Sequence, residues 1–231
     1  MDLMLIGYET PITIALFVIG LIITIGAQLK VTGSYNNFRT VKCKRDLSGV
    51  EVARKILDNN GLKNIHIVEV RGQLTDHYDP SRKVIRLSHE VFHGNSIAAI
   101  SVAAHEVGHA IQDKEKYTFM QIRSFIAPIV SFITYAGYFV ALISLLAGVT
   151  GYIKVGILMI LISLIFQLIT LPVEFDASKR AKEQLESLKL INSSESENVK
   201  KMLGAAAMTY VAGVISSIIN LLRLVLMLRD E

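Results

Sequence analysis

Long charge-free hydrophobic runs alternate with polar segments along this chain. Four such runs occupy residues 10–29, 124–153, 155–173 and 202–222. Each run is long enough for a helix, which rises about 1.5 Å per residue, to cross a hydrocarbon core of about 30 Å. The pattern therefore predicts about four transmembrane helices.

The first and last runs each allow two interpretations. Asp2 and Glu9 precede the first run, where a signal peptide would carry basic residues, and no small-residue cleavage site follows it. We therefore interpret this run as a retained anchor. The last run is rich in glycine, alanine and serine, which is typical of a helix that packs closely against other helices. We expect residues 202–228 to form either a fourth span or a buried helix that covers the core.

The polar segment after the first run predicts a small folded unit. Ser48 and Glu51 have the spacing of a capping box, which opens a helix. Residues 65–70 and 83–87 are rich in β-branched side chains and favour two strands. This part of the chain is therefore expected to mix helix and sheet.

The connections of this unit can be predicted as well. Residues 72–81 are polar and rich in turn-forming residues, so we expect a loop between the two strands. Ser88 or Asn95 is expected to cap the helical stretch that leads into the helix over residues 96–112. The polar residues 192–198 are expected to form a short exposed loop between helices. The order helix, strand, strand, helix predicts a small α+β unit.

Composition supports a membrane protein. The chain has 231 residues, of which 52% are hydrophobic, and its mean hydropathy is +0.45. Such a chain is too apolar for an ordinary soluble domain. Its single cysteine, Cys43, excludes an intramolecular disulfide and a metal site built from thiolates.

The basic residues predict an orientation in the membrane. They gather beside the first and third runs, at Lys30, Arg39, Lys42, Lys44 and Arg45, and at Lys179, Arg180 and Lys182. Such clusters mark the cytoplasmic side of a membrane more readily than a nucleic-acid site. Residues 30–123 and 174–201 are then cytoplasmic, and residues 124–173 form a hairpin that turns near residues 148–154. Side chains after the third run can thus reach the cytoplasmic unit.

Residues 105–109 read His-Glu-Val-Gly-His, an HExxH motif within the expected helix 96–112. Spacing of four places His105 and His109 on one helical face, where both can bind a single Zn²⁺. Glu106 points to the side, where it can accept a proton from a metal-bound water. The alternative is an amphipathic helix whose histidines only form hydrogen bonds in a core.

A catalytic zinc site usually takes a third protein ligand. Glu174, at the cytoplasmic end of the third run, is the strongest candidate, although it could be an ordinary interfacial charge. Asp176 is the rival, and on a helix it faces nearly opposite Glu174. The remaining candidates are His66, which we interpret as structural, and His89 and His93, whose spacing of four allows either a second metal site or plain surface polarity.

Three further side chains could polarise a carbonyl or stabilise an oxyanion. His77 and Tyr78 lie in the expected polar loop, and Tyr210 lies in the fourth run. His77 could equally contact solvent or backbone, so the loop leaves both possibilities open.

Several segments together resemble a known family. Besides the HExxH motif, residues 76–80 (DHYDP), 171–181 (LPVEFDASKRA) and 209–212 (TYVA) resemble the YugP-like neutral zinc metallopeptidases of bacterial membranes. The likeness covers essentially the whole chain. It implies a membrane-bound zinc peptidase with a zincin-like domain and a gluzincin-type site, more distantly similar to the HtpX proteases.

The resemblance also implies roles for individual residues. His105, His109 and Glu174 would hold one Zn²⁺ per chain, and Glu106 would be the base. HtpX-like proteases carry an aspartate four positions after the ligand glutamate, and this chain has Ser178 there. Support for the ligands is therefore expected from Ser178, from Asp176 or from a residue elsewhere in the chain.

We predict an α+β, mostly helical membrane protein with about four transmembrane helices and a small cytoplasmic domain. It would be a multi-pass zinc endopeptidase of the bacterial inner membrane whose active site faces the cytoplasm. Its partners would be a polypeptide substrate and the lipid bilayer, with no nucleic acid. The substrate is expected to add a strand to an edge formed by Lys83, Val84, Ile85, Arg86 and Leu87.

Two other functions are alternatives to a peptidase. The first is a non-catalytic adaptor or scaffold in which zinc is purely structural and stabilises the fold. The second is a transporter, which is disfavoured because the hydrophobic runs carry almost no ionisable residues.

Overall fold

The computed structural model describes residues 10–146 and 152–229, which fall into two compact units. The first unit comprises the described parts of Met1–Gln28, Ile122–Thr170 and Thr209–Glu231. The second comprises Leu29–Gln121 and Leu171–Met208.

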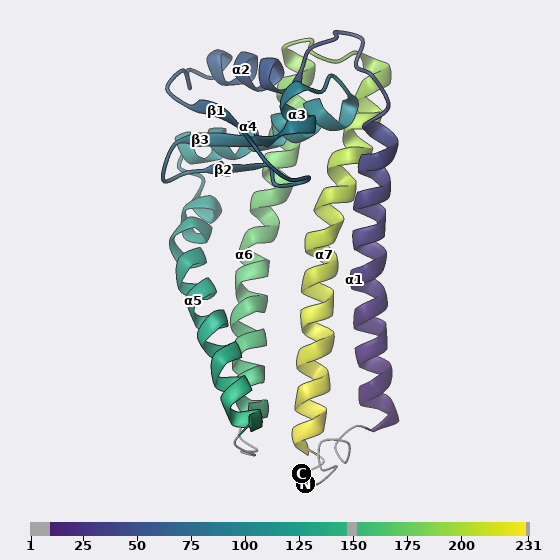
Figure 1. Cartoon of the computed structure of the whole chain (residues 1–231), viewed down its shortest axis with the longest axis vertical. Coiled ribbons are helices and arrows are strands. Elements are labelled where there is room, and N and C mark those ends of the chain that lie inside the picture. The colour runs from purple at the N-terminus through teal and green to yellow at the C-terminus, as the bar shows by residue number, and fades with distance from the viewer. Residues whose placement is uncertain (1–9, 147–151, 230–231) are drawn as a thin grey trace. The chain divides into compact units, whose positions relative to one another are not determined.

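Four long helices supply the apolar part of the chain (Figure 1). They are α1 (Pro11–Phe38), α5 (Thr118–Leu146), α6 (Tyr152–Ser187) and α7 (Ser193–Arg229). Among the described residues these four helices are long and apolar enough to cross a membrane, which confirms the predicted number. Phe125 and Phe132 of α5 are 74% and 73% exposed, as lipid-facing side chains would be. The expected turn near residues 148–154 lies mostly outside the described residues.

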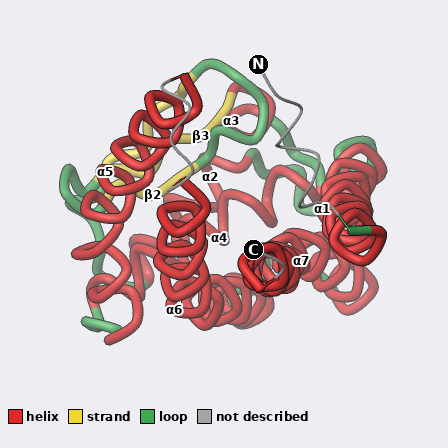
Figure 2. Tube along the Cα trace, turned by 90° about the horizontal axis from the view of Figure 1, so that it is seen from below, coloured by secondary structure: helices red, strands yellow, loops and turns green. Residues whose placement is uncertain are grey.

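Within the first unit, α7 packs between α1 and α6 (Figure 2). The hydroxyls of Ser216 on α7 and Thr24 on α1 are 2.9 Å apart. On the other side of α7, the Gln167 amide donates to the Ser217 hydroxyl over 3.0 Å. Small hydroxyl-bearing residues thus make polar contacts on both sides of α7.

The second unit contains a three-stranded sheet and the short helices around it (Figure 1). Its elements in chain order are α2 (Gly49–Asn59), β1 (His66–Val70), β2 (His77–Asp79), β3 (Val84–Ser88), α3 (His89–His93) and α4 (Ile97–Lys114). The predicted capping box is present, because the Ser48 side chain accepts from the Glu51 N–H and Glu51 accepts from the Ser48 N–H. The core includes Ile56 of α2, Leu87 of β3 and Ile100 of α4, each fully buried.

The sheet order β1-β3-β2 corrects one expectation about the substrate edge. β3 pairs with β1 in parallel and with β2 in antiparallel orientation. The prediction that residues 83–87 form an edge strand is therefore wrong, since the backbone groups of β3 are already paired on both sides. The expected loop over residues 72–81 instead contains β2, which is an edge strand.

Three helix boundaries also differ from expectation. Neither Ser88 nor Asn95 caps the motif helix α4; the Ser96 hydroxyl does so by accepting from the Ala99 N–H over 3.2 Å. Ser88 is instead the N-cap residue of the short helix α3, where its side chain makes no capping hydrogen bond. The expected loop over residues 192–198 is mostly the first turns of α7, because the Asn192 side chain accepts from the N–H groups of Ser194 and Glu195.

Candidate metal centre

Helix α4 places the two histidines of the HExxH motif next to each other. The sequence before them is rich in alanine, and the Ser96 cap fixes where the helix starts. His105 and His109 follow one turn apart, and their ring centroids are 4.8 Å apart. The predicted shared face is therefore present.

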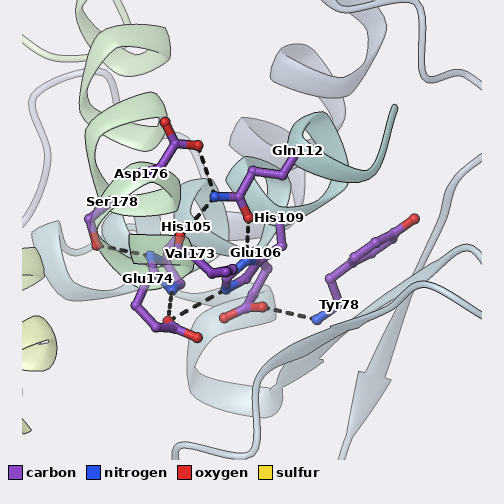
Figure 3. A network of polar contacts seen from close by, with 9 residues as sticks. All are labelled: Tyr78, His105, Glu106, His109, Gln112, Val173, Glu174, Asp176 and Ser178. Atoms are coloured by element: carbon purple, nitrogen blue, oxygen red, sulfur yellow. Dashed lines mark hydrogen bonds and ion pairs between the residues drawn. The ribbon is translucent and has the colours of Figure 1, made fainter. Parts of the chain in front are cut away.

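Helix α6 brings Glu174 to the same place (Figure 3). Glu174 Oε2 lies 3.2 Å from His105 Nε2 and 3.6 Å from His109 Nε2. One ligand atom from each of the three side chains lies within 4.8 Å of the others. Glu174 is only 2% exposed, so the carboxylate faces the histidines and not solvent.

Asp176, the rival ligand, has different partners. Its Oδ2 accepts from Gln112 Nε2 over 2.8 Å and from the Arg180 guanidinium over 2.5 Å. The structure therefore gathers Glu174, and not Asp176, with the two histidines.

Gly108 allows α4 and α6 to come this close. A Cβ atom at this position would lie 2.6 Å from the Ala177 carbonyl oxygen, which is shorter than any normal contact. Ala177 is on the same helix as Glu174. Because Gly108 has no side chain, α6 can pack directly on α4.

Two polar side chains hold the outer nitrogens of the histidines (Figure 3). His105 Nδ1 lies 3.2 Å from Ser178 Oγ, and His109 Nδ1 lies 3.0 Å from Gln112 Oε1. The Gln112 amide nitrogen donates to Val173 O over 2.8 Å and to Asp176. The Gln112 side-chain oxygen is therefore the atom that faces His109. Because this oxygen can only accept a hydrogen bond, His109 Nδ1 must carry a proton. That tautomer leaves the Nε2 lone pair directed at Glu174.

Sequence reasoning predicted part of this support. Ser178 contacts His105 directly, whereas Asp176 acts on His109 through Gln112. Gln112 was missed, although it lies three residues after His109 on the same helical face, a spacing at which side chains meet.

The donor set suits zinc. Zn²⁺ in proteins is bound by imidazole nitrogens and carboxylate oxygens, and catalytic sites use three such ligands. His105, His109 and Glu174 offer two imidazole nitrogens, with His109 held in the correct tautomer, and one buried carboxylate. The hydrogen bonds to the outer nitrogens are the kind that orient histidine ligands in metal sites.

Glu106 lies beside this cluster but turns toward the sheet. Its Oε2 accepts a 2.9 Å hydrogen bond from the backbone N–H of Tyr78 on β2. Burial raises the pKa of Glu106 to about 7, with the charge of His105 opposing the rise and that of Glu174 adding to it. Glu106 is thus a buried carboxyl group that gains a proton more readily than an ordinary glutamate.

Two of the other predicted donors have partners outside the ligand cluster. His77 is exposed and its Nδ1 contacts Thr75 O within its own loop. The Tyr78 hydroxyl donates to Asp113 Oδ2 over 2.6 Å, so its ring points away from the ligand cluster (Figure 3). Tyr210 lies on the part of α7 that belongs to the first unit.

Comparison with known proteins agrees with this chemistry. The profile of a family described as "putative neutral zinc metallopeptidase" matches residues 13–229. A relative from Bacillus subtilis (strain 168), named "Putative membrane protease YugP", is 46% identical over 208 residues, which are 89% of this chain and 92% of the relative. No solved structure matches.

Proposed function

This chain belongs to the family of neutral zinc metallopeptidases, and from that premise we propose that it is a zinc-dependent endopeptidase anchored in the cell membrane. The observation that carries the proposal is the convergence of His105, His109 and Glu174, with Glu106 beside them. We assign the three converging side chains as the zinc ligands and Glu106 as the general base.

The metal and the protein would divide the chemistry between them. A zinc ion bound there would supply Lewis acidity, which lowers the pKa of a water to about 7 and polarises a carbonyl. Glu106 would take a proton from the attacking water and deliver it to the leaving amine. The Tyr78 N–H bond holds one oxygen of Glu106, and we assign the other oxygen to the proton transfer.

The edge strand β2 is the place where an extended substrate can add a strand. The Tyr78 N–H points away from β3, because it donates to Glu106. The Tyr78 carbonyl then also points outward, since both backbone groups of one residue in an antiparallel strand face the same side. We propose that this carbonyl accepts an N–H of the substrate next to the scissile bond.

The basic clusters support an orientation with the second unit at the cytoplasmic face. Lys30 and Arg39 follow the apolar part of α1, and Lys179 and Arg180 follow that of α6. By the positive-inside rule these ends lie in the cytoplasm. Substrates would then be unfolded or membrane-proximal polypeptides of the cytoplasmic side.

Glu106→Gln tests the proposed reaction. The amide cannot accept the proton, so we expect cleavage of an unfolded casein-like substrate to fall by about 10²- to 10⁴-fold, while zinc content stays unchanged. The measurements are proteolysis and metal analysis of the full-length protein in detergent. Undiminished cleavage by this variant contradicts the mechanism, and zinc without cleavage in the wild type favours the adaptor or scaffold.

A further inference from the structure

A second cluster of histidine and glutamate lies on the surface of the second unit. His89 and His93 are the first and last residues of α3, and Glu69 lies on β1. Glu69 Oε1 is 2.7 Å from His89 Nδ1, and Glu69 Oε2 is 2.9 Å from His93 Nε2. One ligand atom from each residue lies within 4.8 Å of the others.

The fold itself brings these three residues together. β1 and β3 are parallel, with Glu69 opposite Leu87 and Val70 opposite Ser88. Because α3 starts directly after Ser88, the end of β1 lies beside this helix. The spacing of four puts both imidazoles on one face of α3, and their ring centroids are 4.8 Å apart.

The cluster has the same donors as the catalytic centre. In both, two histidines four residues apart meet one glutamate from another element. The ring separation is 4.8 Å in each pair. Glu90 follows His89 directly in the sequence, but the carboxylate that meets both histidines is that of Glu69.

Glu90 is occupied by other partners. It accepts from the Tyr35 hydroxyl and from the Gln73 amide, each over 3.1 Å. Arg39 lies 3.8 Å from it. Glu90 therefore serves as a natural control for Glu69.

We propose that Glu69, His89 and His93 form a second metal site that takes a borderline divalent ion such as Zn²⁺. Imidazole and carboxylate donors in this number suit such an ion. A hollow of about 370 Å³ adjoins the two histidines on the side away from Glu69, with Tyr35, Arg39, Glu90 and Asn95 also in its wall. It leaves room for water or a small anion to complete the coordination.

This site differs from the catalytic centre in its exposure. The side chains of Glu69, His89 and His93 are 42%, 73% and 55% exposed, whereas Glu174 is buried. The surface ion is therefore the exchangeable one of the two. When bound, it ties β1 to α3, and α3 in turn packs on the motif helix α4.

Zinc titration of the full-length protein in detergent tests this site. Equilibrium dialysis is expected to give two zinc equivalents, one resistant to a weak chelator and one that the chelator removes. Glu69→Gln and His93→Ala should each lose the removable equivalent and keep the resistant one. Their exposed side chains make it possible to replace them without disturbing the core.

Glu90→Gln and His66→Ala are the matched controls and should keep both equivalents. The removable equivalent should also raise the thermal stability of the wild type but not of His93→Ala. Saturation of the wild type by the resistant equivalent alone overturns the site, as does a removable equivalent that persists in the Glu69→Gln/His93→Ala double variant. None of these outcomes depends on proteolysis, so the site and the proposed activity can fail separately.

Discussion

At the scale of single residues, Gln112 links three parts of the candidate centre. It is fully buried, and it contacts His109, Asp176 and the Val173 carbonyl. A histidine that keeps one tautomer presents the other nitrogen to a metal at all times, so Gln112 prepares His109 for binding before any ion arrives.

Gln112→Met should therefore weaken zinc binding without removing a ligand. Methionine fills a similar volume but leaves His109 Nδ1 and the Val173 carbonyl without this partner. We expect zinc affinity to fall by about 10- to 100-fold and stability by roughly 1–3 kcal/mol. Competition with a calibrated chelator and denaturant unfolding measure the two effects.

Ser178→Ala is the comparison for this prediction. The Ser178 contact is longer, at 3.2 Å, and the His105 side chain is 16% exposed against 7% for His109. Water can therefore replace the serine hydroxyl more easily, and the loss of affinity should be smaller. Equal zinc retention in Gln112→Met and the wild type would contradict the role given to Gln112.

Tyr78 contributes to the centre through its backbone and to stability through its side chain. Its N–H donates to Glu106, whereas its hydroxyl donates to Asp113, which also pairs with Lys83. Tyr78→Phe keeps the backbone bond and removes the hydroxyl. We expect cleavage rates close to the wild type and a loss of about 1 kcal/mol in unfolding free energy.

The comparison of rate with stability decides between two roles for Tyr78. A hydroxyl that polarised the substrate carbonyl would lower the turnover rate by orders of magnitude in Tyr78→Phe, at unchanged stability. Steady-state cleavage and thermal unfolding of the same preparation separate these outcomes.

At the scale of elements, the centre depends on how closely α4 and α6 pack. Gly108 is a point of close approach, because any side chain there would collide with the Ala177 backbone. Backbone cannot move aside as a flexible side chain can, so the helices would have to separate.

Gly108→Ala is expected to cost zinc affinity although alanine favours helix formation. Separation of the helices would move Glu174 away from the two histidines. We expect loss of the resistant zinc equivalent and a lower melting temperature. Gly204→Ala on α7 is the control, since a Cβ there meets nothing within 4 Å, and it should keep its zinc.

The elements also show what the sequence could predict and what it could not. The helix at Gly49–Asn59 was predictable, because its capping box depends on two residues three positions apart. The strand β2 was not, because His77–Asp79 contains an acidic residue and is short, and pairing with β3 makes it a strand. The central place of β3 depends on the same long-range pairing.

The candidate centre was predictable to a similar degree. His105, Glu106 and His109 are local in sequence and follow from helical spacing alone. The approach of Glu174 required a topological argument, and Gln112 required knowledge of which side chains face the gap between α4 and α6. The Glu69 cluster could not be predicted, because the parallel pairing of β1 with β3 creates it.

At the scale of the whole molecule, the chain passes repeatedly between the two units. The second unit is completed by Leu171–Met208, which follows α5 and the apolar part of α6 in the chain. Among the candidate ligands, His105 and His109 lie before α5, and Glu174 lies after the apolar part of α6. A bound zinc ion therefore crosslinks segments that are distant along the chain.

Removal of zinc should for this reason loosen the second unit while leaving the apolar helices folded. Binding to the native state alone stabilises it by about 2.7 kcal/mol when zinc is at 100 times its Kd. We expect a strong chelator to increase amide hydrogen exchange in α4 and in the 171–187 part of α6, with little change in α1.

The experiment is best done on His93→Ala, so that only the ion at His105, His109 and Glu174 contributes. In Glu106→Gln the chelator should increase hydrogen exchange in the same segments. In His109→Ala the exchange should already be fast before chelator is added. If the chelator changes the hydrogen exchange of His109→Ala and of the His93→Ala background to the same extent, zinc does not join these segments.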